Sequence, residues 1–339
     1  MRSAAAISEH LDTRTAAIEV AALLEKAMDG PTDLVLVFAS FHHRESFEDA
    51  IADIQTTLAP KTIVGVTAES VVGCDLELEG VAGLSAIAMH LPGVTVTPWT
   101  TTPKKPLPIS RPEEIPAWIG LQEDTKAVLF FADPFSTPIT RLLPALTSCR
   151  GEGNPLPIIG GMASGASQAT FNRLIIGGEG QRSGGIGLTL SGPLQVDCIA
   201  SQGCRPVGSH YKVTKVDRNV ILELGGKPAL EVLQQLAKEA SPQDRKLIEG
   251  GLLLGSVIDE HKSHFGRGDF LIRSILGLDR KRNGIAAGEF YRLGKTVQFH
   301  VRDAQTAVED LQLLLDAQQL SEIPFGGLLV TCNGRGRSL

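Results

Sequence analysis

Glycine-containing turns after two short apolar segments carry the groups best suited to hold a small ligand. The turns occupy matching places, each just past a segment that we expect to be a buried strand. Ligands of α/β proteins bind outside the carboxyl ends of strands, where backbone amides converge. The candidate ligand-binding residues are Gly65, Gly160 and Gly161 through their amides and Glu69 and Ser164 through their side chains. A structural interpretation, in which the glycines only permit tight turns or close packing, stays equally open.

Arginine and amide side chains in the C-terminal region suit a small anion. Arg302, Asn333 and Arg335 lie at expected strand ends or turns. A guanidinium is a planar fork that matches a carboxylate, so we predict that these residues contact an acidic or amino-acid ligand. Asp303 would then hold an ammonium group, although a carboxylate directly before an apolar helical stripe is first a helix cap. For Arg302 an intramolecular ion pair is the alternative.

Familiar enzyme and metal motifs are incomplete in this chain. The serine of Gly161–Gly165 stands one place too late for a nucleophile elbow, and Gly225–Lys227 is followed by Pro228 instead of the Ser or Thr of a phosphate loop. His261 and His264 share a short segment, but their surroundings predict a solvated loop rather than a complete ligand set. We therefore predict no catalytic residues, no metal and no cofactor.

Composition and charge exclude several classes of protein. The chain of 339 residues has 32 Lys and Arg against 38 Asp and Glu, a net charge of 32 − 38 = −6, so nothing favours a nucleic-acid or an acidic membrane partner. Apolar runs such as Leu34–Ala39 are far too short to cross a bilayer, and acidic residues interrupt the N-terminus where a signal peptide would be apolar. Five cysteines make no disulfide framework. We expect a soluble, cytoplasmic protein.

Alternating helices and strands must position the candidate groups. A helix that Asp12 or Ser8 caps ends at Gly30. The elements expected after it are the strand Leu34–Ala39, the helix Phe47–Leu58, the strand Lys61–Thr67 and a hairpin pair made of Gly83–His90 and Val94–Trp99. Six prolines within residues 98–116 then indicate an extended connector, because proline neither donates to a sheet nor fits inside a helix.

The same order of elements returns after this connector. Its strands are expected at Ala127–Ala132, Ile158–Ala163, Gly184–Leu190 and Leu194–Ala200, with a helix within residues 134–146. The first of these strands is offset from Leu34 by 127 − 34 = 93 residues, and the second is offset from Ile63 by 158 − 63 = 95. We therefore predict that residues 34–99 and 127–200 are two copies of one β-α-β-β-β unit.

A second α/β region follows. Thr296–Arg302 alternates as a half-buried strand, and Asp303 begins a helix. The stripe of this helix that we expect to face the core is Ala304, Ala307, Val308, Leu311, Leu314 and Leu315. Phe325–Cys332 is an apolar strand near the end of the sequence. Because such a strand needs neighbours on both sides, we expect the region to be truncated or this strand to lie at an edge.

Several segments together resemble the FIST proteins, a sensory family named for its link with F-box proteins and intracellular signal transduction. The matching segments are Leu34–Ser40, Ile63–Glu69 and Pro157–Gly161 for the N-terminal FIST domain, and Asn219–Leu230, Val297–Asp303 and Gly326–Gly336 for the C-terminal one. The resemblance implies a ligand-sensing role, with amino acids among the proposed ligands, and it brings no catalytic residues. Val66 stands where relatives often have cysteine, which argues against a thiol-dependent role there.

We predict a mixed-sheet α/β protein with an N-terminal helix (residues 1–30), a duplicated FIST N-terminal-like domain (31–205) and a FIST C-terminal-like domain (206–339). The predicted function is non-catalytic sensing of a small ligand, an amino acid or small carboxylate, with a signalling protein as partner. A scaffold that binds proteins through its surface is the alternative. An unrecognised hydrolase ranks third and would need an acid–base pair near Ser164 or Cys74.

Overall fold

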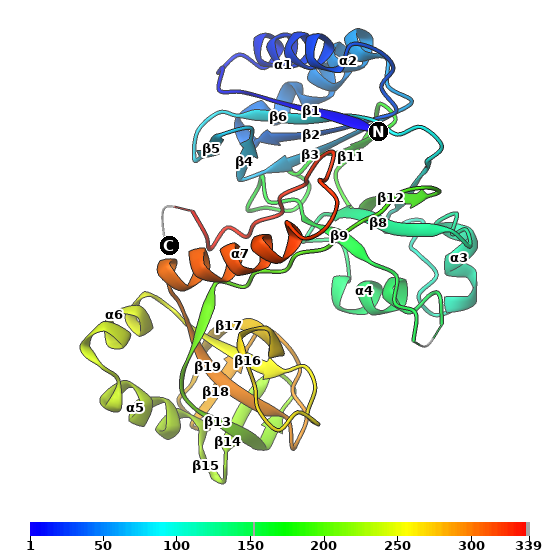
Figure 1. The fold of residues 1–339 in the computed structure, drawn as a ribbon. Coiled ribbons are helices and arrows are strands. Elements are labelled where there is room, and N and C mark those ends of the chain that lie inside the picture. The colour runs from blue at the N-terminus through cyan, green and yellow to red at the C-terminus, as the bar shows by residue number, and fades with distance from the viewer. Residues whose placement is uncertain (152, 337–339) are drawn as a thin grey trace. The chain divides into compact units, whose positions relative to one another are not determined.

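The computed structural model describes residues 1–151 and 153–336, which form a mixed α/β protein (Figure 1). The chain divides into two compact units. Unit 1 comprises Met1–Asp197 together with residues 324–336, here called the return segment, and unit 2 comprises Cys198–Ile323. Unit 2 is therefore inserted between two stretches of unit 1.

Unit 1 contains two main β-sheets and a small hairpin, β4 (Ser70–Gly73) with β5 (Leu76–Glu79). The first sheet has the order β1-β6-β2-β3-β10-β11, and the second has the order β7-β12-β8-β9. The strands of the first sheet are β1 (Arg2–Ser8), β6 (Leu84–His90), β2 (Leu34–Ser40), β3 (Thr62–Ala68), β10 (Leu174–Ile176) and β11 (Glu179–Gln181). Those of the second are β7 (Thr95–Thr101), β12 (Gly185–Ser191), β8 (Thr125–Ala132) and β9 (Ile158–Met162).

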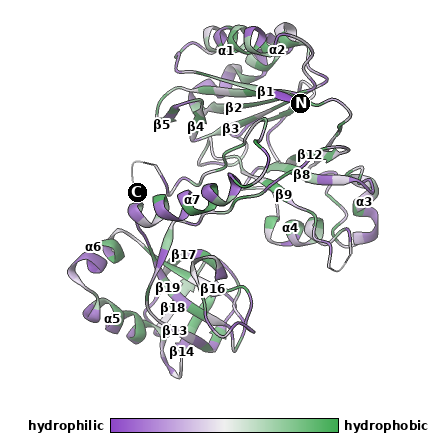
Figure 2. Ribbon diagram, viewed as in Figure 1, coloured by the Kyte–Doolittle hydropathy of each residue, from purple (hydrophilic) through white to green (hydrophobic). Residues whose placement is uncertain are grey.

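Apolar packing arranges these sheets between two layers of helices. The covering helices are α1 (Thr13–Met28) and α2 (Phe47–Leu58) on the first sheet, and α3 (Ile115–Trp118) and α4 (Ile139–Thr147) on the second. Leu36 and Val66 of the first sheet meet Phe131 and Leu188 of the second in a cluster between the sheets. β2 thus buries both faces, as its unbroken apolar run predicts, whereas α1 and α2 alternate hydrophilic and hydrophobic residues (Figure 2).

The two predicted hairpins are wrong. β7 pairs with β12 and not with β6, whose neighbours are β1 and β2. The strand beside β6 is instead β1, which precedes the predicted N-terminal helix. Leu194–Ala200 is not a strand, because β12 already has β7 and β8 on its two sides. The turn that follows β6 therefore carries the chain from one sheet to the other.

Unit 2 is a seven-stranded sheet that closes on itself. Its order is β13-β19-β16-β17-β18-β14-β15, and β13 pairs with both β19 and β14. The strands are β13 (Cys204–Asp217), β14 (Val220–Leu224), β15 (Lys227–Pro228), β16 (Leu252–Val257), β17 (Phe270–Asp279), β18 (Gly284–Ala287) and β19 (Thr296–Arg302). The helices are α5 (Ala229–Glu239), α6 (Pro242–Gly250) and α7 (Ala304–Gln318). Phe299 and Val301 of β19 lie in the core of this unit.

Two C-terminal predictions are corrected. Of the stripe expected to be buried on α7, Ala307 is buried, whereas the Val308 side chain is 68% exposed and Leu311 and Leu315 are also exposed. An amphipathic pattern indicates an apolar face but not a layer that covers it. Phe325–Cys332 is not a strand. The described contacts of this segment with the rest of unit 1 are side-chain contacts and single hydrogen bonds, not the regular backbone hydrogen bonds of a β-strand.

Within the described residues, no helix combines the length and apolar character that a membrane crossing needs. The same residues bring no three His, Cys, Asp or Glu side chains together in a way that would hold a metal ion.

Candidate functional site

The carboxyl ends of β3 and β9, one from each sheet, meet directly. The carbonyl oxygen of Thr67 accepts hydrogen bonds from the amides of Ser164 at 3.2 Å and Gly165 at 3.3 Å. The amide of Glu69 donates in turn to Ser164 Oγ at 3.1 Å. The two turns that the sequence singles out therefore face each other, and in this structure their amides donate to protein oxygens.

Packing explains two of the candidate glycines. A Cβ added at Gly160 would lie 2.0 Å from the carbonyl oxygen of Phe130, and the φ of +143° is one that other residues rarely adopt. At Gly65 an added Cβ would lie 2.9 Å from Ile51 Cδ1 of α2, so this glycine lets the helix approach the sheet. Gly161 is different, because its nearest neighbour would be a Val330 methyl at 3.6 Å.

The return segment brings a third predicted residue to this junction. The side-chain amide of Asn333 donates to Glu69 Oε2, so Glu69, Ser164 and Asn333 form one polar cluster. Arg335 follows two residues later, and its amide closes a turn by donating to the Cys332 carbonyl at 2.9 Å. The start of the segment is anchored as well, by a hydrogen bond from Ser3 Oγ to the carbonyl of Phe325 at 2.7 Å.

Arg302 belongs to unit 2, so it is not part of that cluster. It ends β19, opposite Cys204 of β13. Asp303 caps α7, as predicted, by accepting a hydrogen bond from the Gln305 amide at 3.2 Å, and it also accepts one from Arg205 Nε at 2.7 Å. An ammonium-binding role for Asp303 therefore competes with two partners already in place.

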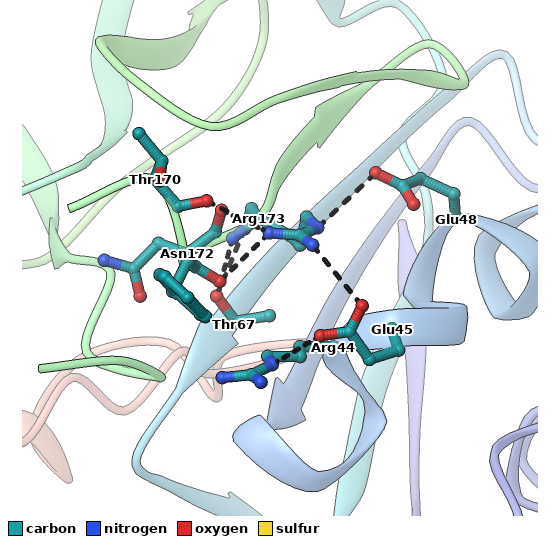
Figure 3. A network of polar contacts seen from close by, with 8 residues as sticks. Arg44, Glu45, Glu48, Thr67, Thr170, Asn172 and Arg173 are labelled. Atoms are coloured by element: carbon teal, nitrogen blue, oxygen red, sulfur yellow. Dashed lines mark hydrogen bonds and ion pairs between the residues drawn. The ribbon is translucent and has the colours of Figure 1, made fainter. Parts of the chain in front are cut away.

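A buried arginine that sequence patterns did not indicate lies on the other side of Thr67. Arg173 directly precedes β10, which pairs with β3. Its amide donates to Thr67 Oγ1 at 2.9 Å, and its carbonyl accepts from the Thr67 amide at 3.0 Å. The side chain is only 4% exposed, and Figure 3 shows it lying between a loop and two glutamates. Its Nη1 donates to the carbonyls of Thr170, Phe171 and Asn172 at 3.1–3.3 Å.

The acidic partners of Arg173 are exposed and held at a distance. Nη2 lies 3.9 Å from Glu45 of the 3₁₀ helix Phe41–Ser46, and Nε lies 3.7 Å from Glu48 of α2. Their side chains are 71% and 44% exposed. Nε makes no hydrogen bond among the described residues. A buried guanidinium normally satisfies its donors. Because Nε is itself buried, an anion would bind on this side of Arg173 only after the neighbouring glutamate side chains shift.

Arg44 adds a second guanidinium beside the same glutamate. Its Nε donates to Glu45 Oε1 at 2.8 Å, and this hydrogen bond lowers the pKa of the Glu45 carboxyl below its ordinary value. The Arg44 guanidinium also lies 4.9 Å from the centre of the Phe171 ring. The area around Arg173 thus has alternating charge, with an ionised carboxylate between two arginines.

The loop that carries Arg173 is held in place by the buried carboxylate of Asp133. Asn172 Nδ2 donates to Asp133 Oδ1 at 3.0 Å, and Ser136 Oγ donates to Asp133 Oδ2 at 2.6 Å. Figure 3 shows the Asn172 side chain directed away from the Arg173 guanidinium. This contact set therefore positions the loop rather than extending the Arg173 site. The sequence signal for it is a polar pair, Asn172 and Arg173, directly before a short apolar run.

Family models match nearly the whole chain. The FIST N domain model matches residues 33–227, and the FIST C domain model matches residues 229–339. An uncharacterized protein of Mycobacterium tuberculosis (strain CDC 1551 / Oshkosh) is 35% identical over 349 residues, covering 100% of this chain and 87% of the relative. An uncharacterized protein of Mycobacterium bovis is 32% identical over 356 residues, covering 100% of this chain and 86% of the relative.

Proposed function

The chain belongs to the FIST family, whose domains are associated with sensing in signal transduction, and from that premise we propose that it is a non-catalytic sensory module for a small carboxylate or amino acid. The observation that carries this proposal is Arg173, a buried guanidinium whose Nε makes no hydrogen bond within residues 1–151 and 153–336 and whose acidic partners are exposed.

An amino acid suits the charges around Arg173. Its carboxylate would accept from Nε and Nη2, the donors that now face glutamates only at ion-pair distance. Its ammonium group would lie between Glu45 and Glu48. Because an exposed ion pair contributes little, lengthening the 3.9 Å contact between Glu45 and Arg173 Nη2 to admit the carboxylate costs little.

We assign the Glu69, Ser164 and Asn333 cluster to the same site as a second contact set. Thr67 joins the two, since its carbonyl accepts from Ser164 and its hydroxyl accepts from Arg173. A ligand that competes for Glu69 would release Asn333 of the return segment, while the hydrogen bond from Ser3 to Phe325 stays in place. Gly161 and Arg335 stay proposed contacts of this site, and Arg302 stays a proposed anion contact within unit 2. No catalytic role is proposed for Ser164 or Cys74, whose described partners are the Glu69 amide and the Ala5 carbonyl.

Calorimetric titration of the full chain with the standard amino acids and small carboxylates tests this function. The variant R173Q removes the buried charge, and R44Q removes the neighbouring charge that donates to Glu45 Oε1. We expect R173Q to weaken a ligand of the wild type at least roughly tenfold and R44Q to weaken it much less. A folded R173Q variant with wild-type affinity, or a wild type that binds none of these compounds, would contradict the proposal.

We also propose that unit 1 arose by internal duplication. Its support is the order shared by two groups of strands, β1-β6-β2-β3 and β7-β12-β8-β9, in which β2–β3 and β8–β9 are the parallel pairs. On this basis the copies begin one strand earlier than the predicted repeats, at β1 and β7. The composition supports a cytoplasmic setting, which we keep as part of the proposal.

Protein binding is a second candidate function, and α7 is the observation that favours it. Val308, Leu311 and Leu315 follow one another at i, i+3 and i+7 on one face of this helix, and all three are exposed. Exposed apolar residues grouped on a helix are typical of a contact surface. Affinity capture with the wild type and with V308D, in the absence of any small ligand, would separate the two functions, because only a protein partner would be lost in V308D.

A further inference from the structure

A hollow of about 610 Å³ lies in unit 2 between α5, α6 and β17. Its volume is within the range of sites for small ligands, about 300–1,000 Å³. The aliphatic side chains that line it are Leu230, Leu233, Ile248, Leu252, Ile275 and Leu278. Leu278 is 44% exposed and the others are half-buried. The hollow therefore presents apolar surface to water, which an apolar ligand would cover.

One guanidinium at the rim of this hollow lacks a partner. Arg280 lines the hollow, and no hydrogen bond or ion pair joins its side chain to the described residues. The nearest acid along the chain, Asp279, accepts from Arg282 Nε at 2.6 Å instead. Asp217 is bound by Arg282 as well, at 2.7 Å. Arg282 thus engages both carboxylates and leaves the charge of Arg280 uncompensated.

Two side-chain amides line the same hollow as Arg280. Asn283 and Gln234 also line the hollow, and their side chains make no hydrogen bond with the described residues. Asn283 is held in place by its backbone, since its carbonyl accepts from the Leu230 amide at 3.0 Å and its φ is +53°. A planar fork with two neighbouring amides matches a carboxylate in shape and charge.

We infer that this hollow binds an aliphatic carboxylate, with the hydrocarbon chain against the leucine and isoleucine floor and the carboxylate on Arg280. The site shares no residue with the Arg173 site, and it goes beyond the function proposed above. A second copy of the chain or an apolar protein segment would also cover the floor, but neither accounts for an unpaired guanidinium at the rim.

Octanoate is the probe, tested on the full chain by displacement of anilinonaphthalene sulfonate, whose fluorescence rises in apolar sites. Octanol, which lacks the carboxylate, is the ligand control. R280Q removes the rim charge, and K281Q removes the same charge one residue away, outside the lining. L278W fills the hollow from an exposed position that tolerates a larger side chain.

We expect octanoate to displace the dye, R280Q to weaken octanoate roughly tenfold without changing octanol, and K281Q to have no effect. L278W should weaken both ligands. The inference is overturned if octanoate does not displace the dye, if R280Q and K281Q behave alike, or if light scattering shows a dimer that L278W dissociates. R173Q should leave octanoate binding unchanged, so failure here and failure at Arg173 are separate results.

Discussion

Two arginines of this molecule each lie between two acidic residues, yet they are held very differently. Arg205 of β13 donates to Asp244 of α6 and, at 2.7 Å from Nε, to Asp303 at the start of α7. Its side chain is 24% exposed. Arg173 is more deeply buried but has Glu45 and Glu48 only at 3.9 Å and 3.7 Å. Arg205 therefore connects three elements through close hydrogen bonds, whereas the acidic contacts of Arg173 are loose.

The comparison indicates that an arginine with short hydrogen bonds to carboxylates has a structural role, whereas one with only distant acidic partners can still bind a ligand. The hydrogen bonds from Arg205 lower the pKa of Asp244 and of Asp303, and the bond to Asp244 is the main reason that the pKa of Arg205 is raised. All three groups are thus stabilised in their charged forms. A ligand carboxylate would gain little at Arg205, because it would have to replace partners that already satisfy the guanidinium.

The largest expected effect is on R205Q. Removing this arginine leaves Asp244 and Asp303 without their common partner. It also removes the hydrogen bonds that connect α6 and the start of α7 to β13. We expect the free energy of unfolding of unit 2 to fall by about 2–3 kcal/mol, below the value for a fully buried pair because the cluster is partly exposed. Urea unfolding measures it, with R245Q on the exposed side of α6 as control. A loss similar to that of R245Q would remove the distinction between the two arginines.

Acid should act through the same carboxylates. The folded-state pKa values of Asp244 and Asp303 lie below their ordinary value of 3.8. Their stabilisation is therefore complete above the unfolded-state pKa and is lost as the pH falls through the folded-state values. We expect the urea midpoint of unit 2 to decrease between about pH 5 and pH 3, and to decrease less in R205Q. Parallel pH profiles for the two proteins would be the contrary result.

R173Q should cost less stability than R205Q. Its glutamates can be hydrated, and the carbonyls of Thr170 and Phe171 belong to exposed residues. We expect a loss of about 1 kcal/mol, together with the loss of ligand binding described above. Urea unfolding and calorimetry on the same preparation measure both. If R173Q unfolds as easily as R205Q, then Arg173 is also a structural arginine and the sensing site lies elsewhere.

The smallest effects are expected for E45Q and E48Q. Their carboxylates are exposed, so we expect each change to leave the urea midpoint close to that of the wild type. The two ligand classes should differ in affinity instead. Either variant should weaken the binding of an amino acid, whose ammonium group loses a carboxylate partner, more than the binding of a simple carboxylate. Equal changes in affinity for amino acids and simple carboxylates would show that Glu45 and Glu48 do not contact an ammonium group.

Features that depend on one segment were predictable from the sequence, and features that depend on distant pairing were not. The apolar runs at Leu34–Ala39 and Ala127–Ala132 are strands, and Asp303 caps α7 as its residue type predicts. The partner of β7 has no local signal, because β12 lies far along the chain. A periodic stripe likewise predicts α7 but not its exposure, which depends on what packs against it.

The same distinction holds for the candidate site: contacts that depend on turn position were predictable, and those that depend on distant pairing were not. Turn position after a buried strand brings Glu69 and Ser164 into contact, as the matching places of the two turns suggested. Arg173 was missed because its burial results from pairing with Thr67, which is 106 residues away. The polar pair Asn172 and Arg173 before a short apolar run marks the position, but it does not indicate that the Arg173 side chain is buried.

The chain passes between the units twice, before Cys198 and after Ile323. One proteolytic cut before Cys198 leaves unit 2 joined to the return segment, and one cut after Ile323 leaves it joined to Met1–Asp197, so both crossings must be cut to free unit 2. For the same reason a rotation of unit 2 would twist both crossings at once. Tension in residues 319–323 would then reach the return segment along the polypeptide itself, first at Phe325, whose carbonyl accepts a hydrogen bond from Ser3 Oγ.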